Sequence, residues 1–176
     1  MTRKEQDLIL RHSTAIFVNS VKQVLKDMAD ADFAVSLKPV GLIPSPQNGM
    51  VVIAHFSGMI QGDFLIATDE VTAARTAGVY VQGASPAAMI VRRETYAGLM
   101  CEVMNVCSHH SIEELEDMFG VLTILPPAWI YGEYHSADFI SGIGLIEGSC
   151  GSMYCSLNLN LISLQIVDKL QKTCGP

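Results

Sequence analysis

Glu102 and Asn105 lie on the outer face of a helix that the sequence predicts across residues 87–109. They are three positions apart, so a carboxylate and a carboxamide project from the same side within one turn. Gly98 lies between their directions one turn earlier, although Gly costs an exposed helix interior about 1 kcal/mol relative to Ala. A face that keeps these residue types indicates a surface where another backbone comes close to hydrogen-bonding groups.

The opposite side of this helix is predicted to face the core. At about 100° per residue, seven mostly apolar side chains fall together there: Tyr96, Leu99, Met100, Val103, Met104, Val106 and Cys107. Cys101 and His109 instead share the outer face with Glu102 and Asn105. These outward residues form a candidate site on one exposed helix surface.

A second long amphipathic helix is predicted at residues 4–29. Its buried stripe consists of Leu10, Thr14, Phe17, Val18, Val21, Val24, Leu25 and Met28. The runs 33–40, 50–56 and 63–68 read as strands because Pro, Asn and Gly residues separate them. Asp69 is a suitable N-cap for a short helix that reaches about Tyr80.

The second half of the chain repeats this order of elements. After the 87–109 helix, Ser111 and Glu114 have capping-box spacing, which predicts a separate short helix. Three more strands are then predicted, at 121–131, 138–147 and 152–161. The repeated order indicates a weak internal duplication, with halves at about 4–83 and 87–164.

Antiparallel pairing follows from the short turns between neighbouring strands. The Pro126-Pro127 pair falls inside the predicted strand 121–131, so this strand must lie at an edge or contain a bulge. We expect a single α+β domain over residues 1–176. In it, two long helices pack on one face of a largely antiparallel sheet of about six strands.

The composition limits the classes of function. The chain has 176 residues, 49% of them hydrophobic and 16% charged, with a formal net charge of −7. No basic stripe for nucleic acid is present, and no apolar run reaches the roughly 18 residues of a membrane span. The charged N-terminus does not resemble a signal peptide, and the five cysteines form no C-x-x-C pair. We therefore expect a cytoplasmic protein with free thiols.

Glu102 and Asn105, with two residues between them, resemble the E-x-x-N signature of the CheC/CheX phosphatases of bacterial chemotaxis. The Gly turn and strand at 58–67 and the Pro-containing segment at 125–132 also resemble that family. The similarity extends from about residue 9 to residue 161 as a pattern of elements. A single signature is more like CheX than CheC, because the first helix has Ile16 where a second signature would place its carboxylate. By the same wheel arithmetic, Ile16 and Asn19 are expected to point away from the buried stripe of that helix.

This resemblance implies hydrolysis of the aspartyl phosphate on a CheY-like response regulator. Asn105 would orient the attacking water, and Glu102 would pair with the active-site lysine of the regulator. Gly98, Cys101 and His109 would form the partner-binding surface. The protein would need no cofactor of its own, because the regulator supplies Mg²⁺, and no metal site is expected in the chain. CheX-like chains pair, so a homodimer is also expected, with sheet-edge pairing as the economical route.

Two alternatives stay open. A non-catalytic adaptor of the same fold, related to flagellar-switch modules, is indicated by the absence from 106–111 of a Gly that the family often carries after the Asn. A redox- or metal-responsive module would instead use Cys150, Cys155 and the histidines.

Overall fold

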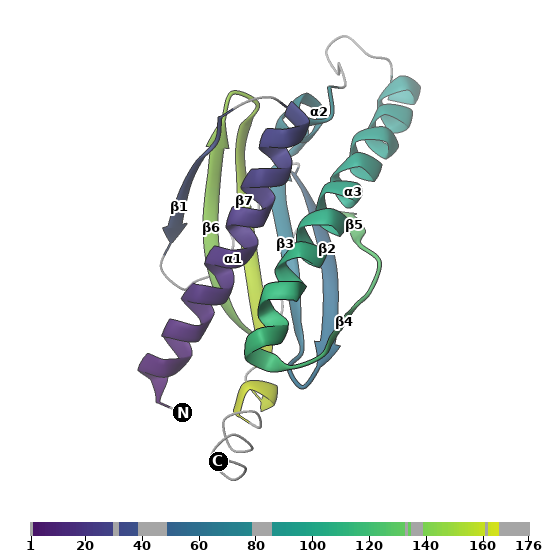
Figure 1. Cartoon of the computed structure of the whole chain (residues 1–176). Helices are drawn as coiled ribbons and strands as arrows, with labels where there is room; N and C mark the ends of the chain where they lie inside the picture. The colour runs from purple at the N-terminus through teal and green to yellow at the C-terminus, as the bar shows by residue number, and fades with distance from the viewer. Residues whose placement is uncertain are drawn as a thin grey trace.

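A computed structural model of the chain describes residues 2–29, 32–38, 49–78, 86–132, 134, 139–160 and 162–165, with residues 29 and 86–91 described by backbone alone. The main helices of these ranges are α1 (Arg3–Ala29), α2 (Glu70–Thr76) and α3 (Pro86–Phe119) (Figure 1). The strands are β1 (Ala34–Lys38), β2 (Gly49–Gly58), β3 (Gly62–Asp69), β4 (Leu122–Ile124), β5 (Ala128–Tyr131), β6 (Phe139–Gly148) and β7 (Gly151–Asn160).

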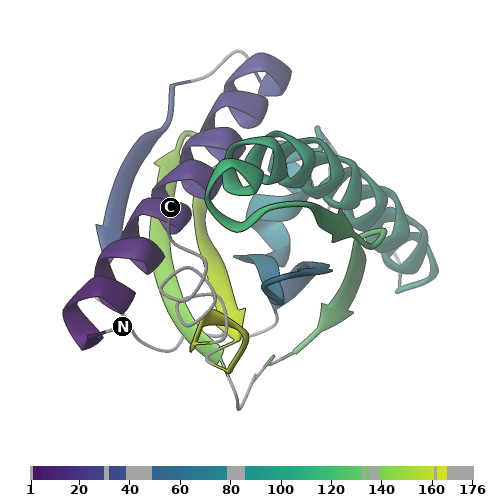
Figure 2. The ribbon, with the colours of Figure 1, turned by 60° about the horizontal axis from the view of Figure 1, so that its bottom comes forward.

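The strands form one antiparallel sheet. Its order is β1-β6-β7-β3-β2-β4, and β5 pairs with β2 along the same edge as β4. Figures 1 and 2 show both long helices on the same face of this sheet. The predicted α+β class is thus confirmed, with seven strands in the described residues where about six were expected.

The additional strand arises because the predicted strand 121–131 is interrupted. Leu125 still donates its backbone N–H to His55 O at 2.8 Å, but Pro126 and Pro127 have no N–H to donate. Pairing with β2 resumes at Ala128. As the sequence predicts, the prolines lie at a sheet edge, and there they divide one strand into β4 and β5.

The core lies between the helices and the sheet. Phe17 of α1 packs on Phe64 of β3, with ring centroids 4.7 Å apart. On β6, a Cβ at Gly142 would meet the Thr14 side chain, and one at Gly144 would meet Val18. These two glycines therefore let α1 lie directly against the sheet. None of the helices in the described part of the chain is long and apolar enough to cross a membrane.

The long helix α3 is continuous, so the predicted helix end at His109 and restart at Ser111 are wrong. The Ser111 hydroxyl does not cap a new helix but donates to Cys107 O one turn earlier, at 2.7 Å. Ile112, Leu115 and Phe119 continue the buried stripe of α3. Apolar burial at helical spacing thus outweighs the local capping signal.

The predicted stripes are mostly buried, with three differences. Met28 at the end of α1 and Val106 on α3 are exposed, and Leu99 is only half-buried. Ile16, which was expected to point outward, is 9% exposed and belongs to the core. The wheel places Val106 at the margin of its stripe, where the width of the neighbouring element decides burial. Met28 lies near the middle of its stripe but only one residue before the end of α1.

The short elements follow the sequence closely. Asp69 caps α2 as predicted, with Oδ1 accepting from Thr72 N at 2.9 Å. The helix ends at Thr76, before the expected end near Tyr80, and residues 79 and 80 lie outside the described part. Residues 39, 40, 138 and 161 at the predicted strand ends also lie outside it. After β7, residues 162–165 form one helical turn.

The strand order is symmetric about the β7–β3 pair. β6 and β2 flank this pair, and the outer positions are held by β1 and by β4 with β5. Each outer strand pairs with a strand of the other sequence half. This order agrees with the pseudo-duplication, which remains our proposal.

Candidate functional site

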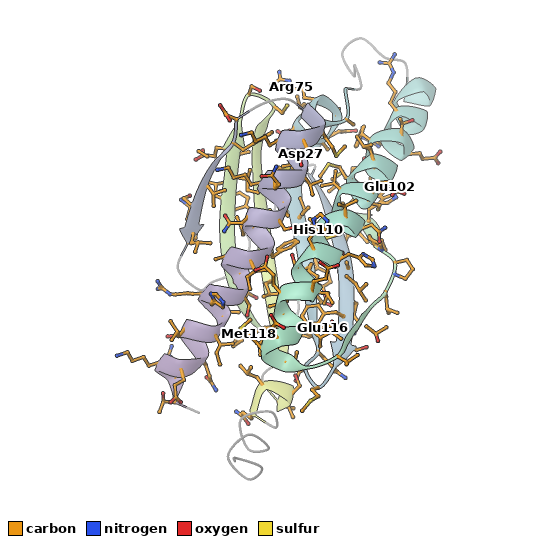
Figure 3. All side chains as sticks on the ribbon, viewed as in Figure 1. Asp27, Arg75, Glu102, His110, Glu116 and Met118 are labelled. Atoms are coloured by element: carbon orange, nitrogen blue, oxygen red, sulfur yellow. The ribbon has the colours of Figure 1, made fainter. Side chains whose placement is uncertain are left out.

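The middle of α3 presents Glu102 and Asn105 on its outer side. Met100, Val103 and Met104 are fully buried, and their packing fixes the rotation of the helix about its axis. Glu102 is consequently exposed and Asn105 is half-buried. In Figure 3, Glu102 leaves α3 on the side that faces away from α1. The structure therefore brings together the two side chains that the sequence singled out.

A groove of about 470 Å³ runs beside this pair. One wall is α3, which contributes Cys101, Glu102, Asn105 and His109. The other wall is the link between β4 and β5, which contributes Ile124, Leu125, Pro126 and Pro127. Because the prolines carry no N–H groups, the second wall offers apolar contact and few hydrogen-bond donors. The polar side chains that line the groove thus all come from α3.

His109 is held against the backbone of the same turn. Its Nδ1 lies 2.7 Å from Asn105 O, and a carbonyl can only accept, so the ring carries its proton on Nδ1 in this contact. This contact holds the His109 ring beside Asn105. Cys101 is partly exposed, and burial together with Glu102 raises the pKa of its thiol. It is therefore a poor nucleophile and serves as a surface residue of the groove.

Gly98 lies one turn from Glu102 but does not line the groove. It is exposed, and a Cβ added to it would meet nothing within 4 Å. Within the described part of the chain, no contact requires a glycine at this position. In addition, no described side chain forms an ion pair with Glu102. Both features leave the outer face of α3 accessible to a partner.

A second cleft of about 640 Å³ lies between α1 and α3. On the α1 side it contains Asn19, three residues after the buried Ile16. His110, Glu113 and Glu114 line it from α3. The first helix thus offers an amide without a neighbouring carboxylate on its own surface. Ile16 fills space between the helices, which explains how an apolar residue is accommodated there.

A hydrogen-bonded cluster at the other end of α3 was not predicted. Arg93 pairs with Glu70 through Nε at 2.6 Å, Tyr96 donates to Glu70 at 2.5 Å, and the Tyr96 and Tyr131 hydroxyls are 2.7 Å apart. We call these four residues the tyrosine network. The hydrogen bond from Arg93 holds the pKa of Glu70 below its ordinary value, and burial raises the pKa of Tyr96. Its members come from α2, α3 and β5, so no local pattern connects them; the only local signal is the i, i+3 spacing of Arg93 and Tyr96.

The cysteines and histidines do not come together as the third alternative requires. Cys155 is fully buried in the core, whereas Cys150 is partly exposed at the β6–β7 turn. In the part of the chain that the structure describes, no three His, Cys, Asp or Glu side chains are grouped as metal ligands. His135 lies outside that part, and His55 pairs with Asp63 at 2.8 Å.

Solved structures share this arrangement of helices and sheet. A chain of the CheX–CheY–BeF3–Mg²⁺ complex from Borrelia burgdorferi matches with a TM-score of 0.67 and 22% identity, over 83% of this chain and 96% of that one. The chain has the CheC/CheX fold. CheX from Desulfovibrio desulfuricans also matches, with a TM-score of 0.62 and 15% identity, over 85% of this chain and 99% of that one.

A further solved structure has a similar fold. FliY from Thermotoga maritima matches with a TM-score of 0.70 and 12% identity, over 98% of both chains. No protein-family model and no curated protein matches the sequence. At these identities the likeness is one of fold, so the chemistry must be argued from the groove itself.

Proposed function

We propose that this chain is a cytoplasmic phosphatase that hydrolyses the aspartyl phosphate of a CheY-like response regulator. The observation that carries the proposal is the position of Asn105 and Glu102 in one open groove of a CheC/CheX fold. The chemical requirement is small. An acyl phosphate is already activated, and the Mg²⁺ of the regulator neutralises phosphoryl charge, so the phosphatase need only orient a water in line with the P–O bond.

Asn105 is suited to that task. Its carboxamide can accept a hydrogen bond from the water while its NH2 group donates toward the phosphoryl oxygens. The half-buried position restricts its rotamers, and an oriented amide loses less entropy on binding than a free one. The amide contributes orientation alone, so no covalent intermediate on this chain and no cofactor of its own are required.

Glu102 provides the docking charge. It is exposed, and no described cation pairs with it, so its carboxylate can pair with the active-site lysine of the regulator. This ion pair would set the register that brings Asn105 over the phosphoryl group. Gly98, Cys101 and His109 would form the surrounding contact surface, which is flat at Gly98 for lack of a side chain.

The test is the rate at which a phosphorylated regulator loses phosphate in the presence of Mg²⁺. Asn105→Ala should remove the acceleration that the wild-type protein gives. Asn19→Ala changes an exposed amide on α1 and is the matched control, with a rate equal to wild type.

A second candidate is a non-catalytic adaptor of the same fold. The match to FliY over nearly the whole chain favours it, as does the exposed Val106 directly after Asn105. An adaptor would bind the regulator without accelerating loss of phosphate, and Asn105→Ala would leave binding and rate unchanged. We also propose a homodimer that pairs through β1, a sheet edge with no partner on its outer side among the described strands, and light scattering would give twice the mass of one chain.

A further inference from the structure

The edge strand β5 exposes an aromatic pair. All four of its residues are exposed, and Trp129 and Tyr131 alternate onto the same face, paired with the core residues Val52 and Met50 of β2. The two rings meet edge to face, with centroids 5.3 Å apart. Trp129 is the only tryptophan of the chain, and 37% of it is exposed on the side of the sheet that carries α3.

The tyrosine network holds this pair in place. The Tyr131 hydroxyl bonds to the buried Tyr96 of α3, and the Arg93 guanidinium lies over the Tyr131 ring at 5.2 Å. Glu70 of α2 accepts from both Tyr96 and Arg93. Two residues of α3 thus hold the Tyr131 ring directly, and Glu70 of α2 holds those two residues in turn. Trp129 rests against the Tyr131 ring. An exposed side chain held by buried partners loses little conformational entropy when a partner covers it.

The aromatic pair is continuous with the groove. Pro127 lines the groove wall, and Trp129 follows it by two residues along the edge of the sheet. Leu125, on the same wall, is 51% exposed. Tryptophan, tyrosine and arginine are the residue types that most often dominate the energy of protein interfaces. The groove and the aromatic pair therefore form one surface, polar at Asn105 and aromatic at β5.

We propose that the docking surface for the response regulator extends from the groove along β5 to Trp129, which packs against an apolar patch on the regulator, and that the tyrosine network positions Trp129. This inference rests on the proposed function, because it assigns a binding contact to the same partner. Trp129 touches the regulator away from the phosphoryl group. It therefore contributes to affinity and leaves the chemical step unchanged.

The first test compares Trp129→Ala with Ile130→Ala. Ile130 has the same exposed fraction of 37% but pairs with Val51, which faces the other side of the sheet. Trp129→Ala should raise the KM for a phosphorylated CheY-type receiver domain about 10-fold with kcat unchanged. Ile130→Ala should stay within about twofold of wild type. Equal KM values for the two variants would overturn the proposal.

The second test uses the single tryptophan as a probe. The chain is labelled with 5-fluorotryptophan, and its one 19F resonance is followed while an unlabelled receiver domain, activated with BeF3 and Mg²⁺, is added. The resonance should shift in the wild type and equally in Asn105→Ala, because the contact does not depend on catalysis. Tyr131→Phe keeps the ring but removes its hydroxyl. It should alter the resonance of the free protein and raise KM about threefold, since one neutral hydrogen bond is lost.

The outcomes separate the two proposals. If turnover depends on Asn105 but the receiver does not shift the 19F resonance, the role of Trp129 is overturned and the proposed function stands. A resonance that moves on dilution of the chain alone would assign β5 to self-association and also overturn that role. A wild-type protein that neither binds the receiver nor accelerates its dephosphorylation would overturn both.

Discussion

At the scale of single residues, the division of work between Glu102 and Asn105 is the point that mutagenesis can resolve. Both lie in one groove, but Glu102 is exposed and Asn105 is half-buried. An exposed charge acts over distance during encounter, whereas a held amide acts on the bound phosphoryl group. The two side chains should therefore affect different kinetic constants.

Glu102→Gln should raise KM about 10-fold and change kcat little, because it removes the docking charge and keeps the shape of the side chain. Higher salt should raise the KM of the wild type more than that of the variant, because salt screens an ion pair that only the wild type can form. Glu94→Gln removes an equal charge from the exposed surface of the same helix and is the control. A fall in kcat without a rise in KM would instead assign Glu102 to the chemical step.

Gly98 offers a test in which stability and function change in opposite directions. Gly98→Ala should raise the free energy of unfolding by about 0.5–1 kcal/mol, because Ala is the better helix former and its Cβ meets no atom within 4 Å. Gly98→Gln adds bulk where the regulator would approach and should raise KM. Urea unfolding and steady-state kinetics measure the two effects. A long side chain at position 98 that leaves KM unchanged would contradict the role of Gly98 in approach.

At the scale of elements, the sequence predicts the outer face of α3 correctly but not its length. Periodicity places Gly98, Glu102, Asn105 and His109 on one accessible side, because burial at helical spacing is a strong signal. The restart at Ser111 was wrong because a capping box is a local pattern that also occurs inside helices. The groove wall at Pro126 and Pro127 was expected only as an edge or bulge, since its distance from α3 depends on the whole sheet.

No sequence pattern connects the whole tyrosine network, because its members are separated by up to 61 positions, from Glu70 to Tyr131. Tyr96 was assigned to the core by periodicity, and it is fully buried as predicted. The hydroxyl at the end of that ring requires a partner inside the protein. A buried tyrosine near an arginine one turn away was the available hint, but it does not identify Glu70.

The network should make stability depend on pH in a defined direction. The pKa of Glu70 is lowered in the folded protein by the hydrogen bond from Arg93, so its contribution is present above the ordinary value of 4.5 and is lost as the pH falls through the folded pKa. Glu70→Gln should lower the free energy of unfolding by about 1–2 kcal/mol at pH 7, and by progressively less below pH 4.5.

Urea unfolding of both proteins between pH 7 and pH 3 measures this difference. The pKa of Asp69 is also lowered, but Asp69 is present in both proteins, so its contribution cancels in the difference between them. Glu94→Gln, which changes an exposed carboxylate, is the control and should show no such trend. A difference between wild type and Glu70→Gln that stays constant with pH would contradict the assigned ionic contact.

At the scale of the whole molecule, the fold places two helices side by side over one sheet and gives them unequal surfaces. The α3 surface carries a carboxylate, an amide and a groove, while α1 carries Asn19 beside a buried Ile16. The symmetric strand order explains why both helices have related positions in the sheet. One active surface on α3 is therefore the expectation for the intact protein.

The most direct measurement is the loss of phosphate from a phosphorylated CheY-type receiver domain with Mg²⁺, compared for wild type, Asn105→Ala and Asn19→Ala. The wild type and Asn19→Ala should accelerate the loss equally. Asn105→Ala should lower kcat about 100-fold, which is the rate loss expected when a reacting group is misplaced by about 1 Å. The free energy of unfolding should stay unchanged. Equal rates for wild type and Asn105→Ala would contradict the assignment of α3 as the catalytic surface.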